Sequence, residues 1–198
     1  MQNSTSKVRV LTGTAMLGAV AAVLMYLEFP IPIMPAFVKL DVSELPALIA
    51  SFAYGPVSGI LVCLIKNLIK LPSTSTAAVG ELFNFVMGAL FVGVAGLIYK
   101  RNKTRKGAIA GALLGALVMA VVSVPYNYFI VYPAYVVMYH LPLDAIIGMY
   151  QAINPNVNGL LACLLVFNLP FTFVKGALDA VLCFLVYKPL SPILHGRK

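Results

Sequence analysis

The segment FVKLDVSELP, residues 37–46, is a polar stretch with two acidic side chains between long apolar runs. Hydrophobic residues make up 61% of the whole chain and charged residues only 10%, and the mean hydropathy is +0.96. Soluble globular domains carry far more charge and are far less hydrophobic. The sequence therefore predicts an all-α integral membrane protein, in which residues 37–46 form either a solvent loop or the edge of a binding site.

The apolar runs predict six transmembrane helices in a single domain, residues 1–198. A helix needs about 20 apolar residues to cross a bilayer. The first run lacks a small-residue cleavage site before Pro30, so we expect it to stay in the membrane and not to be removed as a signal peptide. A break is expected at Asn168-Leu169-Pro170, before the last span. Long spans are predicted at residues 10–29, 80–99, 107–135 and 170–187.

Basic residues gather near the predicted helix ends, and this explains the net charge of +8 without nucleic-acid binding. Lys and Arg at the ends of spans mark the cytoplasmic side of a membrane protein. We therefore expect both termini and the loop at residues 100–106 to be cytoplasmic. The three clusters are Lys7 and Arg9; Lys100, Arg101, Lys103, Arg105 and Lys106; and Lys188, Arg197 and Lys198.

This orientation requires an even number of crossings before residue 100, so the apolar run at residues 44–71 must cross twice or not at all. Gly55-Pro56 offers a break within it. The prediction is two helices, at residues 44–54 and 56–70. The first would be only about 16 Å long against a hydrocarbon core of about 30 Å, so neighbouring helices would have to shelter it.

The even number of crossings before residue 100 also places polar residues from several helices at the outer end of the protein. Amides donate and accept hydrogen bonds, a lysine favours a carbonyl group, and aromatic side chains cover the faces of a ring. The set predicts a pocket for a flat, neutral ligand with polar edges. Its members are Asp41, Ser43, Lys66, Asn67, Glu81, Asn84, Asn127, Asn168, Thr172 and Lys175, with Phe37, Tyr126, Tyr128, Tyr132 and Phe171 as aromatic neighbours.

Lys175 lies inside the last predicted span, where an ionisable side chain indicates a functional site. Asp179 follows four residues later, on the same face of a helix. The alternative hypothesis is therefore a structural pair between Lys175 and Asp179.

Motifs for catalysis are missing from the sequence. There is no phosphate-binding loop, no nucleophile elbow and no HExxH helix, and His140 and His195 are far apart. Cys63, Cys163 and Cys183 lie singly in apolar runs, which is typical of small core residues and not of metal ligands. The chain is predicted to be no enzyme and to hold no metal or cofactor. It would be a receptor, a gradient-driven carrier, or one subunit of a larger machine.

Small residues recur at helical spacing in the first span, at Ala15, Gly18, Ala19 and Ala22. Such rows let two helix backbones approach closely in lipid. From spacing alone, they could pack against this protein's own helices or against a partner.

Several short segments follow one another with a specific order and spacing over nearly the whole chain. They are FVKLDVSELPALI (residues 37–49), Gly55-Pro56, Lys66-Asn67, VGE (79–81) with Asn84, Asn127-Tyr128, PAY (133–135), PFT (170–172) and VKG (174–176). In these segments the chain resembles the riboflavin-specific S components, of the RibU type, that belong to energy-coupling factor (ECF) transporters.

The resemblance implies a six-helix subunit of a bacterial cell membrane that captures riboflavin from outside, with the first extracellular loop as a cap. It implies as partners one transmembrane coupling subunit and two ATPase subunits, and a docking signature that matches Ala15 and Ala19. Thr172 departs from the family pattern, in which asparagine also occurs. The predicted substrate-binding residues are Leu40, Asp41, Ser43, Glu81, Asn84, Asn127, Asn168, Thr172 and Lys175, and the predicted docking residues are Ala15, Gly18, Ala19 and Ala22.

Two alternatives stay open at this point. Within the class, the ligand could be another vitamin such as thiamin, whose cationic ring would need more buried carboxylate. Across classes, the chain could be a secondary transporter or a small membrane enzyme. Strong internal repeats would favour the carrier, and none is evident in the sequence.

Overall fold

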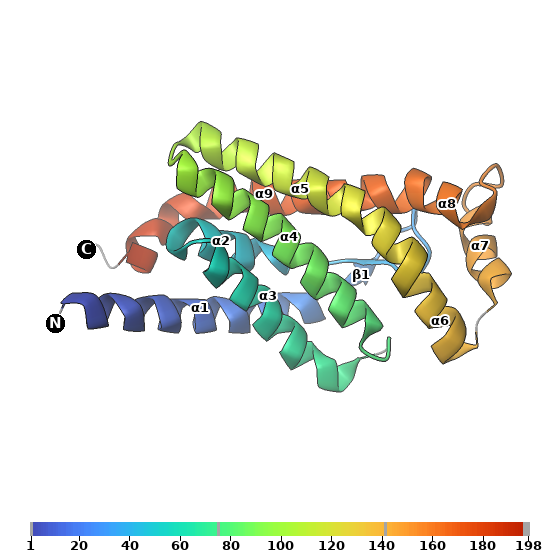
Figure 1. The fold of residues 1–198 in the computed structure, drawn as a ribbon, viewed down its shortest axis with the longest axis horizontal. Helices are drawn as coiled ribbons and strands as arrows, with labels where there is room; N and C mark the ends of the chain where they lie inside the picture. Colours follow the sequence, from blue (N-terminus) through green and yellow to red (C-terminus); the bar gives the residue numbers. More distant parts are fainter. Residues whose placement is uncertain (1, 75, 141, 196–198) are drawn as a thin grey trace.

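A computed structural model describes residues 2–74, 76–140 and 142–195, and most of them lie in helices that run along the long axis of the molecule (Figure 1). The helices are α1 Gln2–Tyr26, α2 Glu44–Tyr54, α3 Pro56–Lys70, α4 Val79–Arg101, α5 Arg105–Tyr126, α6 Tyr132–Tyr139, α7 Leu143–Gln151, α8 Gly159–Cys163 and α9 Leu169–His195. Strands β1 Phe29–Pro30 and β2 Lys39–Leu40 form an antiparallel pair in the loop between α1 and α2. A 3₁₀ turn, Leu71–Ser73, follows α3.

Helices α2 and α3 separate at Gly55, as the sequence predicts. Gly55 has φ +103°, a conformation that side-chain-bearing residues rarely adopt, and its N–H caps α2 through Ser51 O. Pro56 then begins α3, where its missing N–H is harmless. Gly55 and Pro56 therefore account for the break between the two helices.

Two π-helical turns interrupt the long helices without breaking them. Asn127–Val131 joins α5 to α6, and Leu164–Asn168 joins α8 to α9. In each case a proline follows two residues later, at Pro133 and Pro170, and a widened turn accommodates a ring that would clash with a regular preceding turn. The predicted break at residues 168–170 is therefore wrong, because the helix absorbs Pro170 through the π turn.

Five helical segments of the described chain are long and apolar enough to cross a membrane. Helix α2 has 11 residues and is not among them, so the predicted count of six spans depends on this one short helix. The all-α membrane architecture agrees with the prediction. The five segments are Lys7–Tyr26, Pro56–Ser73, Val79–Arg101, Arg105–Tyr139 and Gly159–Tyr187.

The two ends of the bundle differ in character. The start of α1, the end of α9 and the α4–α5 turn lie at one end, and the β1–β2 pair and the α3–α4 turn lie toward the other (Figure 1). The first end therefore carries the basic residues of α1 and of residues 100–106. The third predicted basic cluster falls outside the described part, since the side chain of Lys188 and all of Arg197 and Lys198 are not described.

The small residues of α1 divide between two faces. Gly18 and Ala22 are buried, and a Cβ added at Gly18 would lie 2.8 Å from Ile65 Cγ2 on α3. These two residues therefore pack within the chain's own bundle, and the docking role of the four small residues stays a prediction. Ala15 and Ala19 are exposed on the other side of the helix.

Candidate functional site

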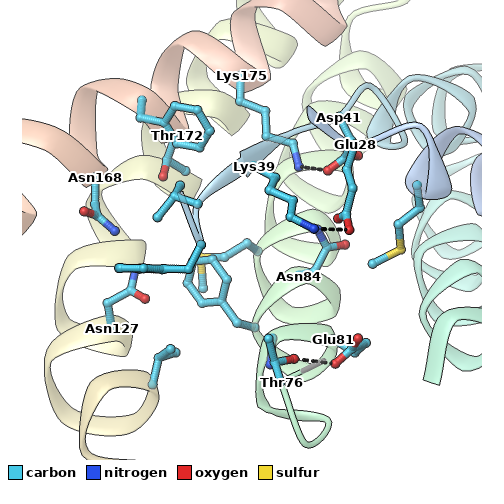
Figure 2. Close-up of a pocket in the computed structure, with 18 of the residues that line it drawn as sticks. Glu28, Lys39, Asp41, Thr76, Glu81, Asn84, Asn127, Asn168, Thr172 and Lys175 are labelled. Atoms are coloured by element: carbon cyan, nitrogen blue, oxygen red, sulfur yellow. Dashed lines mark hydrogen bonds and ion pairs between the residues drawn. The ribbon is translucent and has the colours of Figure 1, made fainter. Parts of the chain in front are cut away.

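A cavity of about 200 Å³ lies in the half of the bundle that contains the β1–β2 pair. Its walls come from the end of α1, the loop before α2, the start of α4, the α5–α6 π turn and α9 (Figure 2). The described residues that line it are Met25, Glu28, Phe37, Val38, Lys39, Asp41, Glu44, Lys70, Thr76, Gly80, Glu81, Phe83, Asn84, Met87, Met119, Asn127, Val131, Tyr132, Tyr135, Asn168, Phe171, Thr172 and Lys175.

Seven of the nine predicted binding residues line this cavity. Leu40 and Ser43 do not. Ser43, the last residue of the loop before α2, is fully buried; its hydroxyl accepts a hydrogen bond from Lys66 Nζ and its backbone N–H donates to Asp41 Oδ1 at 2.8 Å. Ser43 therefore orients Asp41 and does not face the cavity. The seven that line it are Asp41, Glu81, Asn84, Asn127, Asn168, Thr172 and Lys175.

An ionic cluster forms one wall. Lys175 Nζ lies 2.8 Å from Asp41 Oδ2 and 3.2 Å from Glu44 Oε2, while Lys66 Nζ lies 2.8 Å from Glu44 Oε1. Burial raises the pKa of Asp41, but the Lys175 and Lys66 ammonium groups outweigh it and hold the pKa of that carboxyl well below its usual range. Asp41 is therefore an anion bound to Lys175.

The alternative pair between Lys175 and Asp179 is not formed. The Lys175 ammonium turns to the loop and to α2, and neither carboxyl oxygen of Asp179 has a hydrogen-bond partner among the described residues. Helical spacing favoured a pair between Lys175 and Asp179, but in the tertiary fold Asp41 and Glu44 bind the Lys175 ammonium instead. Lys175 therefore connects α9 to the loop at residues 27–43.

Neutral polar groups form the facing wall, and Figure 2 shows Asn127 and Asn168 across the cavity from the pair of Lys175 and Asp41. The Tyr150 hydroxyl donates to Asn168 Oδ1 at 2.7 Å and lies 2.5 Å from the Tyr132 hydroxyl. Asn127 Nδ2 donates to Ser123 O at 2.8 Å, one helical turn earlier. Within the described part of the chain, the second N–H and the oxygen of the Asn127 amide are left for a ligand.

Both of these asparagines belong to π turns. Asn127 begins the first turn and Asn168 ends the second. A π turn shifts the register of a helix by one residue and commonly occurs at functional sites. The two prolines that require the turns thus also set the direction in which the amides point.

Other predicted members have structural partners. Glu81 Oε2 accepts hydrogen bonds from Thr74 Oγ1 at 2.7 Å and from Thr76 Oγ1 at 2.8 Å, which closes the turn before α4. Asn84 Oδ1 accepts from Asn67 Nδ2 at 3.3 Å. These groups line the cavity while they also hold its edge together.

Among the predicted aromatic neighbours, Phe37, Tyr132 and Phe171 line the cavity, whereas Tyr126 and Tyr128 do not. Tyr126 packs against Phe83, and Tyr128 is exposed on the outside of the bundle. Sequence reasoning did not identify Tyr135 as lining the cavity or Tyr150 as part of the neutral wall.

The loop between α1 and α2 is fastened to both sides of the cavity. Phe37 makes edge contacts with the rings of Tyr132 and Tyr150, with centroids 6.4 and 6.2 Å away. Within the loop, Lys39 Nζ lies 2.9 Å from Glu28 Oε1, which follows the end of α1. Together with the pair of Asp41 and Lys175, these contacts make residues 37–41 one wall of the cavity, as a capping loop would be.

Comparison with known proteins places this architecture in a family. Residues 9–187 match the family described as ECF transporter, substrate-specific component. The chain belongs to this family. A solved structure of the S component of a bacterial ECF transporter superposes with a TM-score of 0.73 at 32% identity, covering 98% of this chain and 99% of that one.

Two sequence relatives extend the comparison over nearly the whole S component. The riboflavin transporter RibU of Staphylococcus aureus (strain TCH60) is 34% identical over 180 residues, 91% of this chain and 89% of that protein. The riboflavin transporter FmnP of Bacillus subtilis (strain 168) is 34% identical over 195 residues, 97% of each chain. The chain is therefore a multi-pass membrane transport subunit that binds a substrate, and it is not an enzyme.

Proposed function

We propose that this S component captures riboflavin at the outer side of the membrane and passes it to an ECF module of one transmembrane coupling subunit and two ATPase subunits. The relatives named riboflavin transporters, each similar over at least 89% of its length, support the choice of ligand. The basic end of the bundle supports cytoplasmic termini. The other half of the bundle, which holds the cavity, would then face the outside of the cell.

The observation that carries the proposal is the pairing of a neutral amide wall with Lys175 across one cavity. The uracil-like edge of a flavin alternates acceptor, donor and acceptor, and the free N–H and oxygen of Asn127 match two of these positions. An ammonium group has three N–H donors, and Asp41 and Glu44 occupy two of those on Lys175. The third is left for a flavin carbonyl.

The ring faces and the ribityl chain also find suitable neighbours. Phe37, Tyr132 and Phe171 supply aromatic surface at the cavity, and Thr172 adds a buried hydroxyl beside Lys175. Sugar hydroxyls suit Asp41 and Glu28, which both line the cavity. A cationic vitamin such as thiamin fits less well, because lysines already neutralise the carboxylates of Glu28, Asp41 and Glu44, and the Glu81 carboxylate is held by Thr74 and Thr76.

Riboflavin titration of the purified protein, followed by quenching of flavin fluorescence, tests the proposal. We expect Asn127→Ala and Lys175→Ala each to weaken binding by roughly 1.5 to 3 kcal/mol, about ten- to a hundredfold, because each leaves a desolvated edge unpaired. Lys103→Ala, an exposed lysine at the other end of the bundle, is the matched control. Parent-like affinity in the Lys175 variant would make its ammonium a structural group only.

Docking to the coupling subunit is the second part of the proposal. Ala15 and Ala19 are exposed one turn apart on α1, and small residues at this spacing allow close helix contact in lipid. Ala15→Leu with Ala19→Leu should abolish riboflavin uptake and co-purification with the ATPase subunits. Affinity should change by less than about 0.5 kcal/mol, since the cavity lies on other residues.

The matched control for docking is Ala110→Leu, the same change at an exposed position of α5. Uptake by this variant should equal that of the parent. Retained uptake in the α1 double variant would move the docking face to another helix. Loss of binding and uptake together would mean that the two alanines hold the bundle itself.

A further inference from the structure

Asp179 is a buried acidic side chain near the ionic cluster, and the proposed function does not use it. It lies on α9, one helical turn beyond Lys175, with 0% of its surface exposed. Neither of its carboxyl oxygens has a hydrogen-bond partner within the described chain. A buried carboxylate without donors is very unfavourable, whereas a protonated carboxyl carries no charge. The environment therefore favours an Asp179 that holds a proton in this state.

The charges around it balance without it. Two carboxylates, Asp41 and Glu44, are paired with two ammonium groups, Lys66 and Lys175. Three of these four charged residues lie on helices: Glu44 on α2, Lys66 on α3 and Lys175 on α9. Asp41 alone comes from the loop. An ionised Asp179 would add a third buried negative charge to a neutral cluster.

Movement of the loop changes this balance. Residues 37–41 form one wall of the cavity, so a loop that uncovers the cavity carries Asp41 away from Lys175. Two buried ammonium groups would then face Glu44 alone. One positive charge would lack a partner, and breaking a buried ion pair in this way is strongly destabilising.

We propose that Asp179 takes over the Lys175 ammonium when the loop leaves the cavity. The O–H bond of the Asp179 carboxyl breaks, its proton passes to water in the opened cavity, and the carboxylate pairs with Lys175 one turn away. Closing reverses both steps. Asp179 is then a positioning residue that acts through Lys175 and makes the open state accessible. The inference rests on the proposed function only in taking the loop as the cover of a substrate site.

Loop opening can be measured without any ligand, so the test is separate from the test of riboflavin binding. Met34 is 5% exposed and its neighbour Ile33 is 67% exposed, both in the loop. A maleimide should label Met34→Cys only when the loop opens, and Ile33→Cys at the intrinsic rate of an exposed thiol. Cys63, Cys163 and Cys183 are buried, and the parent protein supplies the background.

We expect Asp179→Asn to slow labelling at position 34 by about tenfold, because the open state loses its counter-charge. Asp41→Asn should accelerate the same labelling, because the closed state loses its ion pair. Labelling at position 33 should respond to neither change. An unchanged or faster rate at position 34 in the Asp179→Asn protein would overturn the proposal, since a packing residue gives that result.

The pH dependence provides a second measurement on protein that keeps Asp179. Because opening releases one proton, the ratio of labelling rates at positions 34 and 33 should rise from pH 5.5 to 7.5, by up to about tenfold per pH unit. Asp41 acts in the opposite direction: its lowered pKa favours the closed loop, and this effect is lost only as the pH falls below the ordinary aspartate range. The other titratable groups beside Asp179 are the buried thiols of Cys63 and Cys183. A ratio that stays flat or falls with rising pH would overturn the proposal.

Discussion

The two walls of the cavity bury polar groups in opposite ways. On one side Glu44 and Asp41 are neutralised by Lys66 and Lys175. On the other side Tyr132, Tyr150 and Asn168 satisfy one another as neutral donors and acceptors. The loop between α1 and α2 contributes the Asp41 carboxylate to the first wall and packs the Phe37 ring against the second. The ionic wall should therefore govern stability most strongly, and the neutral wall should govern the fit of the ligand.

Removing one carboxylate from the ionic wall should have the largest effect. Glu44→Gln leaves Lys66 Nζ fully buried without its carboxylate partner, and breaking such a pair costs about 3 to 5 kcal/mol. Thermal unfolding of the purified protein, followed by size-exclusion chromatography after heating, measures the loss. Glu28→Gln is the matched control, because its ion pairs lie at the partly exposed edge of the cavity and are worth about 1 kcal/mol or less. Equal effects of the two variants would remove the distinction between buried and edge pairs.

Removing one hydroxyl from the neutral wall should have an intermediate effect. Burial raises the pKa of Tyr150, so its hydroxyl stays protonated and donates to Asn168 Oδ1. Tyr150→Phe leaves that oxygen without this donor and should lower stability by about 1 to 2 kcal/mol. Riboflavin affinity should also fall, because Asn168 loses the bond that orients its amide. Tyr128→Phe, on the exposed outside of α5–α6, should change neither quantity, and a Tyr150 variant that also changes neither would make this network incidental.

Loosening the loop at its aromatic contact should have the smallest effect. Phe37→Ala removes two edge contacts, each worth about 0.5 to 1.5 kcal/mol. The expected result is a riboflavin dissociation rate about three- to tenfold faster, measured by displacement with excess unlabelled ligand. Phe29→Ala, an exposed ring on the same loop, is the control. A Phe37 variant with the parent's dissociation rate would leave Asp41 as the main closing contact.

The sequence predicted the fold wherever local chemistry is decisive. Apolar runs of sufficient length indicate membrane helices, and Gly55-Pro56 defines the boundary between α2 and α3 because one residue needs a positive φ and the next cannot donate. The prediction was wrong at Pro170. A proline can end a helix or be absorbed by a π turn, and the packing around the helix decides between these outcomes.

For the site, the sequence by itself determined which polar residues lie at one depth of the membrane, because helix length and charge parity fix depth. It could not determine their partners. Lys175 had Asp179 as a neighbour in the sequence, yet its ammonium pairs with Asp41 and Glu44. Likewise Ala15 and Gly18 share one pattern of small residues, and only the position of α3 shows that Gly18 faces inward. The depth of a residue in the membrane follows from its position along a single helix. The partner of a side chain, and whether it points inward, depend on how several helices pack together, and only the tertiary structure decides this packing.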